Sequence, residues 1–220
     1  MGDVGRTALV FDLDDTLYKE RDYVYSCFRW MGRALGDAGA ADALRRAFEA
    51  GVGDPIGAMM AEKGVAADDR TRLIAEMRDH APDISLSQDA AALLAEMRAQ
   101  NAAFSIVTNG RSGTQRRKIA ALGLGDAASL AISEEVGAEK PDAKAFSAAA
   151  AVHAGAKLVY VGDNPKKDFL APKAMGWLTV MLRDDGRNVH RQVAPTPAHA
   201  AAREIDALTE LLPLLEREAV

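Results

Sequence analysis

The 220-residue sequence has one cysteine, Cys27, and no apolar run long enough to span a membrane. A single cysteine cannot form an intrachain disulfide, which favours a reducing compartment and predicts a cytoplasmic location. Residues Met1 to Arg6 lack the basic and apolar regions of a signal peptide, and Asp12 interrupts the early apolar run that follows. The sequence therefore predicts neither secretion nor a membrane partner.

An excess of positive charge is also absent. The chain has 27 Lys and Arg residues against 32 Asp and Glu residues, a net charge of −5, which argues against a nucleic-acid backbone as a partner. A small phosphorylated ligand stays compatible, because a metal ion and a lysine can reverse the sign of the charge within one cleft. The 4 histidines lack metal-ligand spacing, so no zinc site is expected. With 49% apolar and 27% charged residues, the composition is that of a globular chain that can form one domain with an insert.

The strongest local signal is an apolar run, Ala8 to Phe11, that ends in three carboxylates within four residues: Asp12, Asp14 and Asp15. The run predicts a strand buried on both faces, as in the centre of a parallel sheet. Side chains alternate along a strand, so Asp12 and Asp14 should project to the same side. Neighbouring buried carboxylates repel each other unless a cation or a proton-transfer reaction uses them. A divalent metal with a nucleophile and a general acid or base would use both.

Residues 19–86 carry only helical patterns. Four amphipathic segments are predicted: Val24 to Leu35, Leu44 to Phe48, Pro55 to Met60 with the proline in the first turn, and Leu73 to Met77 after an Asp68 N-cap. This stretch of helices after a single strand predicts an all-helical cap domain over 19–86, with a catalytic core formed by 1–18 and 87–220.

From Ser87 onward, predicted helices alternate with predicted strands. The helices cover 87–100, 114–122, 142–154 and 165–175; the strands cover 103–107, 130–132, 157–161 and 177–182; a long loop over 183–198 precedes an edge strand at 203–205 and a helix around 208–215. This alternation predicts an α/β fold, a Rossmann-like doubly wound parallel sheet. Such sheets bind ligands beyond the carboxyl ends of their strands.

Polar residues stand at these predicted strand ends. Thr108-Asn109-Gly110 follow the second strand, Lys140-Pro141-Asp142 follow the third, Gly162-Asp163-Asn164 follow the fourth, and Asp168 lies beyond them. Taken singly, each is an ordinary turn, cap or loop sequence. Together with Phe11-Asp12-Leu13-Asp14-Asp15-Thr16-Leu17, and in this order, they resemble the four motifs of the haloacid dehalogenase (HAD) superfamily of hydrolases.

The resemblance implies a role for each matched residue. Asp12 would be the nucleophile that forms an aspartyl-phosphate, and Asp14 the general acid and then base. Mg²⁺ would be held by Asp12, the Asp14 backbone carbonyl and Asp163. Thr108, Asn109, Gly110 and Lys140 would bind the phosphoryl group. Asp168, and to a lesser extent Asn164, would orient Lys140 or a metal-bound water.

Four functions remain to be separated. Asp14 favours a phosphatase over an L-2-haloacid dehalogenase, because true dehalogenases lack an aspartate two residues after the nucleophile. Asp15-Thr16, where sugar phosphomutases often have Gly-Val, leans against a phosphomutase. A non-catalytic binding module of the same fold would be expected to have lost a motif residue, and none is lost.

The cap resembles those of phosphoglycolate phosphatases, small-sugar phosphatases and some nucleotidases. The predicted substrate is therefore a small phosphate ester: a sugar phosphate, a phosphoglycolate-like compound or a nucleoside monophosphate. Tyr18, Arg21 and Arg111 are candidate substrate contacts, and His80 lies where the cap should rejoin the core, so it is a candidate to face the cleft. The sequence does not indicate an oligomeric state.

Overall fold

The computed structural model describes residues 7–218, and its central element is β1 (Thr7–Phe11). Six parallel strands form one sheet in the order β3-β2-β1-β4-β5-β6. The other strands are β2 (Phe104–Thr108), β3 (Ser129–Ile132), β4 (Lys157–Gly162), β5 (Leu178–Leu182) and β6 (Arg203–Ile205). The predicted Rossmann-like α/β fold is confirmed. Met1 to Arg6, on which the prediction of no signal peptide rests, lie outside the described residues.

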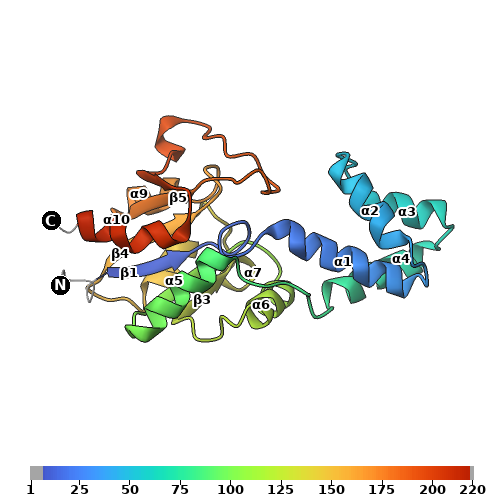
Figure 1. The fold of residues 1–220 in the computed structure, drawn as a ribbon, viewed down its shortest axis with the longest axis horizontal. Helices are drawn as coiled ribbons and strands as arrows, with labels where there is room; N and C mark the ends of the chain where they lie inside the picture. Colours follow the sequence, from blue (N-terminus) through green and yellow to red (C-terminus); the bar gives the residue numbers. More distant parts are fainter. Residues whose placement is uncertain (1–6, 219–220) are drawn as a thin grey trace.

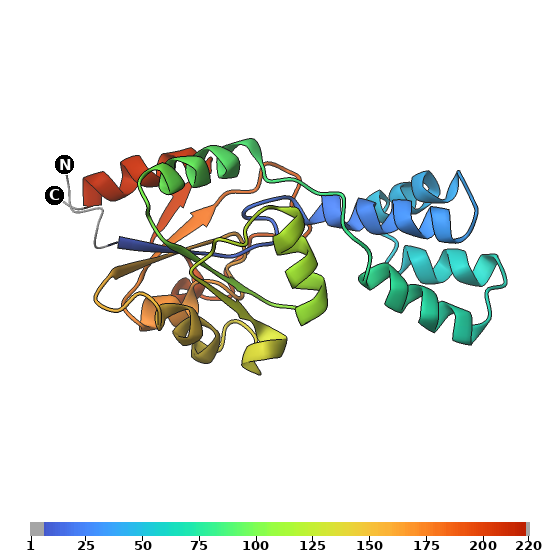
Figure 2. The same ribbon diagram turned by 90° about the horizontal axis from the view of Figure 1, so that it is seen from below.

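Helices cover both faces of the sheet (Figure 2). On one face lie α5 (Gln88–Ala99), α6 (Ser112–Ala121), η3 (Leu208–Glu210) and α10 (Leu211–Glu218); on the other lie α8 (Ala143–Ala150) and α9 (Leu170–Ala174). Alternation along β1 divides its side chains between two apolar clusters, since Leu9 and Phe11 join the first and Val10 the second. Burial on both faces explains the uninterrupted apolar run of this strand.

The helical insert, defined here as α1 to α4, lies between β1 and α5 in the sequence. Its helices are α1 (Glu20–Ala34), α2 (Ala40–Glu49), α3 (Pro55–Glu62) and α4 (Ala67–Arg78). They pack around their own apolar cluster, which includes Phe28, Met31 and Leu44. Figure 1 shows the insert to the right of the core, connected through α1 and the segment that returns to α5. The boundaries predicted for a cap domain, at 18/19 and 86/87, stay a prediction.

Several predicted helix limits were wrong. The helix predicted over 165–175 is only α9, because residues before it form a turn in which the Asn164 carbonyl accepts from the Lys167 and Asp168 amides, both at 3.0 Å. Helix α4 begins at Ala67 with Ala66 as its N-cap, so Asp68 lies inside the first turn, where a carboxylate still complements the helix dipole.

Other limits shifted for local reasons. Asp142 is the N-cap of α8 and accepts from the Lys144 amide at 2.8 Å, but this helix ends at Ala150 rather than 154. Residues 79–86 are an irregular return segment, not helix, and the short α7 (Ser133–Val136) was not predicted. Within residues 7–218, the helices are all too short or too polar to cross a membrane.

Candidate active site

A pocket lies at the carboxyl ends of β1, β2 and β4. This is the topological switch point of the sheet: from β1 the strand order continues to β2 and β3 on one side and to β4, β5 and β6 on the other. Seven of the residues predicted from the motifs line it: Asp12, Asp14, Thr108, Asn109, Lys140, Asp163 and Asn164. Four further residues that were not predicted line it as well: Asp15, Glu20, Lys167 and His190. The folding of the chain thus brings together residues up to 178 positions apart in the sequence (Asp12 to His190).

Lys140 is the cationic centre of the site. Its Nζ lies 2.7 Å from Asp12 Oδ1 and 2.7 Å from Asp168 Oδ1, and it donates to the Tyr160 hydroxyl at 3.0 Å. Burial alone would lower the pKa of this lysine, but the two carboxylates outweigh burial and raise it. Lys140 is therefore held as a buried ammonium between the nucleophile candidate and Asp168.

Three carboxylates surround this one ammonium. Oxygens of Asp12, Asp163 and Asp168 all lie within 4.8 Å of one another. Burial, with repulsion from the neighbouring carboxylates, raises the pKa of Asp12 to about 7 and that of Asp163 to about 9. The excess of buried negative charge and the all-oxygen donor set fit a hard divalent cation such as Mg²⁺. Asp168 is occupied by Lys140 and by the Asn164 amide at 2.8 Å, which leaves Asp12 and Asp163 as the side chains open to a metal.

Asp14 has a separate set of partners. Its Oδ1 accepts from Lys118 Nζ at 2.7 Å and from the Tyr18 hydroxyl, and its Oδ2 accepts from Gln115 Nε2 at 2.9 Å. Burial would raise the pKa of this carboxyl, but the Lys118 ammonium and the hydrogen bonds from Tyr18 and Gln115 together lower it below the usual value. Asp12 and Asp14, which follow β1, therefore have different electrostatic environments, although only one residue separates them.

The third carboxylate of the run, Asp15, has a structural role. Its backbone has a φ of 57°, and its side chain accepts from the Glu20 amide at 2.9 Å and from the Val189 amide at 2.8 Å. The first bond stabilises the start of α1, and the second fixes the long loop after β5. That loop also contacts one metal-ligand candidate, because Asn188 Nδ2 donates to Asp163 Oδ2 at 3.0 Å.

The residues after β2 divide their tasks. Thr108 Oγ1 accepts from Gln115 Nε2 at 2.5 Å, so its hydroxyl hydrogen can still point to a ligand. Asn109 holds the Lys140 backbone from both sides: its Oδ1 accepts from the Lys140 amide at 2.8 Å, and its Nδ2 donates to the Lys140 carbonyl at 3.2 Å. The Gly110 amide donates to Ser133 Oγ at 2.9 Å and the residue does not line the pocket, so its phosphate contact stays a prediction.

Some candidates lie elsewhere. His80 is buried at the junction of the insert and the core, where its Nε2 is 2.8 Å from Ser26 Oγ. It was a candidate to face the cleft, but it does not line the pocket. Arg21 and Arg111 do not line the pocket either, and Tyr18 reaches the site only through its bond to Asp14.

Sequence reasoning missed Gln115 and Lys118 altogether. Both lie in α6, a helix that the motifs do not include, and the only signal for them was their place just after Thr108-Asn109. Glu20 was also missed. Burial and the nearby Asp14 raise its pKa to about 8.

Comparisons with known proteins agree with this geometry. The family model for haloacid dehalogenase-like hydrolases matches residues 9–182, most of the chain and all four motifs. The chain belongs to the haloacid dehalogenase-like hydrolase family. The membership expected from the motifs is confirmed.

Similar proteins of known activity include phosphatases. A phosphoserine phosphatase from Thermus thermophilus is 37% identical over 135 residues, which cover 56% of this chain and 53% of that protein, so the match spans about half of the relative. A glyceraldehyde 3-phosphate phosphatase from Methanopyrus kandleri is 29% identical over 232 aligned positions, which cover 96% of this chain and 98% of that protein. These names support the assignment of this HAD-like hydrolase as a phosphoric monoester hydrolase.

Solved structures show the same fold. The HAD hydrolase YfnB from Bacillus subtilis, in a magnesium-bound crystal structure, has a TM-score of 0.67 at 22% identity and covers 95% of this chain and 98% of its own. An L-2-haloacid dehalogenase also has a TM-score of 0.67, at 17% identity, and covers 97% of this chain and 100% of its own. At these identities the likeness concerns the fold and does not separate phosphatase from dehalogenase.

Proposed function

We propose that this HAD-like hydrolase is a Mg²⁺-dependent phosphatase that acts on a small phosphorylated metabolite through an aspartyl-phosphate. The observation that carries the proposal is the second carboxylate, Asp14, which opens onto the same pocket as Asp12 but has its own hydrogen-bond partners. An alkoxide leaving group needs a proton, whereas a halide does not, so a second carboxylate beside the nucleophile favours phosphate esters.

In this proposal Asp12 is the nucleophile. Lys140 binds Oδ1, so Oδ2 would form the bond to phosphorus while the bond to the ester oxygen breaks. The Lys140 ammonium and the Thr108 hydroxyl would stabilise the negative charge on the phosphoryl oxygens. Asp14, in its protonated form, would give a proton to the leaving oxygen, and the resulting carboxylate would then take one from the water that hydrolyses the aspartyl-phosphate, which restores the protonated form. Asp168 would keep Lys140 in place through its 2.7 Å ion pair.

The side chains of Asp12 and Asp163 and the backbone carbonyl of Asp14 would hold Mg²⁺. Bound there, the ion would neutralise phosphoryl oxygens as a Lewis acid. Asn188, through its 3.0 Å hydrogen bond, would orient the Asp163 carboxylate, and Asn164 would support the same strand end.

We propose that residues 19–86 act as a cap over this pocket. Glu20, the first residue of α1, already lines the pocket, so the insert begins at the site. A cap that closes over a polar pocket excludes water and favours a small substrate over a nucleic acid or a protein. The relatives named for phosphoserine and glyceraldehyde 3-phosphate support a small phosphorylated metabolite as substrate. That the chain has no membrane or nucleic-acid partner stays a prediction. A cytoplasmic location stays a prediction.

The test is hydrolysis of p-nitrophenyl phosphate by the full chain with Mg²⁺, with EDTA, and with Asp12→Asn. We expect metal-dependent turnover that EDTA and Asp12→Asn each abolish, while Asp42→Asn, an exposed carboxylate of the insert, stays active. A panel of sugar phosphates, nucleoside monophosphates and phosphoglycolate then identifies the substrate. Failure of every ester, together with halide release from 2-chloropropionate, would replace the phosphatase assignment by a dehalogenase.

A further inference from the structure

Lys118 is a buried lysine that the proposed reaction does not use. It lies on α6, in the core, and only 4% of its surface is exposed. A buried lysine needs a partner for its charge, and this one has the Asp14 carboxylate, 2.7 Å away. Gln115, one turn earlier on the same helix, binds the other oxygen of Asp14 at 2.9 Å. Helix α6 therefore holds both oxygens of the proposed acid and base.

The same ammonium contacts the base of the helical insert. Lys118 Nζ lies 4.2 Å from the centre of the Tyr23 ring, which belongs to the first turns of α1. Tyr23 in turn stacks on His80, at the beginning of the return segment, with ring centres 5.9 Å apart. Lys118 therefore contacts α1 directly through Tyr23 and the return segment only indirectly, through the Tyr23–His80 stack, while it also binds Asp14.

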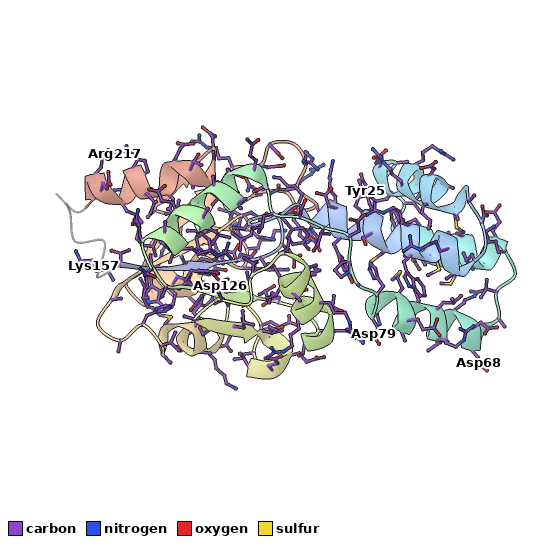
Figure 3. The ribbon with its side chains drawn as sticks, turned by 60° about the horizontal axis from the view of Figure 1, so that its bottom comes forward. Tyr25, Asp68, Asp79, Asp126, Lys157 and Arg217 are labelled. Atoms are coloured by element: carbon purple, nitrogen blue, oxygen red, sulfur yellow. The ribbon has the colours of Figure 1, made fainter. Side chains whose placement is uncertain are left out.

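A second ion pair links α6 to the return segment. Arg117 Nη1 lies 2.9 Å from Asp79 Oδ1, just after the end of α4. Figure 3 labels Asp79, which lies on the side of the insert that turns toward the core. Arg117 and Lys118 are consecutive in α6. A change in the position of the insert against α6 would therefore also change the surroundings of Lys118, which binds Asp14.

We propose that Lys118 is a positioning residue, which fixes the Asp14 carboxylate toward the pocket and ties its position to the contact between α6 and α1. This inference rests on the proposed function, since it concerns the proton transfer assigned to Asp14. Lys118 does not touch the reacting atoms in this arrangement. It acts through Asp14, and Tyr23 acts through Lys118.

The readout is the ratio of kcat/KM for two aryl esters of the same shape, p-nitrophenyl phosphate and phenyl phosphate. Phenolate, with a pKa of about 10 for its conjugate acid, leaves poorly without a proton, whereas nitrophenolate leaves readily. A positioned general acid contributes about 10²–10⁴-fold to the rate of a step that needs its proton. Lys118→Met should therefore lower kcat for phenyl phosphate by about tenfold or more, and it should lower kcat for p-nitrophenyl phosphate far less. KM for both esters should change little.

Two further variants make the test specific. Lys118→Arg, which keeps the charge, should restore most of the ratio. Arg116→Met removes a cation two residues away that binds Glu135 on the exposed side of α6, and it should leave both rates unchanged. Because the ratio compares two substrates on one preparation, a partial loss of folded protein cancels.

The outcomes separate the inference from the proposed function. An unaltered protein that hydrolyses both esters, with a Lys118→Met variant whose ratio is unchanged, overturns the positioning role alone. No hydrolysis of either ester, nor of the metabolite panel, by the unaltered protein overturns the proposed function and the inference with it. Tyr23→Leu should shift the ratio in the same direction by about threefold, in line with the strength of a partly buried cation–π contact. If Lys118→Met shifts the ratio and Tyr23→Leu does not, the link to the insert is overturned.

Discussion

Replacing Lys140 by methionine tests the electrostatic core of the site. Its ammonium lies 2.7 Å from both Asp12 and Asp168. At an effective dielectric constant of roughly 20, each such pair is worth about 6 kcal/mol of Coulomb energy, which largely offsets the desolvation of the charges. Lys140→Met removes the attraction and leaves the carboxylates buried, which typically costs about 3–5 kcal/mol. Asp12, whose pKa is already raised to about 7, can take up a proton, so we expect a loss near the lower limit, about 3 kcal/mol.

The assay is urea unfolding in EDTA, followed by far-ultraviolet circular dichroism, together with hydrolysis of p-nitrophenyl phosphate with Mg²⁺. Activity should fall by about 10²–10³-fold or more, since in the proposed reaction the ammonium would stabilise charge on the phosphoryl group. Lys166→Met, an exposed lysine near the site, is the matched control and should change neither quantity. A Lys140→Met protein that unfolds within about 1 kcal/mol of the unaltered one would refute the buried-charge argument.

Three other perturbations have defined outcomes. A Cβ on Gly162 would lie 2.6 Å from Asp168 Oδ2, so Gly162→Ala should lower the free energy of unfolding by about 2 kcal/mol and reduce hydrolysis. Gly125→Ala, whose Cβ would meet open space, should change neither quantity, and equal stabilities of the two variants would contradict the contact at Gly162. Burial lowers the pKa of His80 below 6.5, so the unfolded chain binds its proton first as the pH falls. Urea titrations should therefore show the free energy of unfolding decreasing as the pH drops through about 6.5, and decreasing less in His80→Gln. If the free energy of unfolding depends on pH equally in the unaltered protein and in His80→Gln, burial of His80 does not cause the pH dependence. Burial raises the pKa of the Cys27 thiol, so a disulfide reagent should label it only after denaturation, and rapid labelling of the native protein would show the burial to be wrong.

The motif residues could be placed from the sequence because the geometry of a parallel sheet largely determines where the ends of its strands lie. A short apolar run with no charge favours a strand buried on both faces, and parallel strands bring their carboxyl ends to one edge. That rule alone joins Asp12, Thr108 and Asp163 in one pocket, as found. The same reasoning located the helical insert, since 3.6-residue periodicity without strand signals continues from α1 to α4.

The partners of Asp14 could not be predicted because they depend on the packing of α6. Lys118 lies in the last turn of that helix, where a cation is common for dipole reasons alone, and nothing in its neighbours marks it as buried. Likewise, the sequence gives no sign that Asp15 would differ from Asp12 and Asp14. Its left-handed backbone lets the side chain accept hydrogen bonds from two backbone amides, although the residue still lines the pocket.

The predicted helix limits were wrong where side chains form hydrogen bonds to backbone groups that a helix would otherwise use. Asn164 and Asp168 form a closed turn after β4, and this turn displaced the start of the predicted helix from Pro165 to Leu170. The turn is what places the Asp168 carboxylate against Lys140. The turn and its buried ion pair thus outweighed a helix pattern in the local sequence.

In the proposed reaction, Asp12 carries the phosphoryl group between the two steps. The direct measurement is mass spectrometry of the protein after a short incubation with p-nitrophenyl phosphate and Mg²⁺, followed by an acid quench and digestion. We predict one added phosphoryl group on the peptide that contains Asp12, its absence in Asp12→Asn, and its accumulation in Asp14→Asn, where the base for the second step is missing. Turnover by the unaltered protein with no phosphorylated peptide, or with Asp12→Asn still active, would contradict the account.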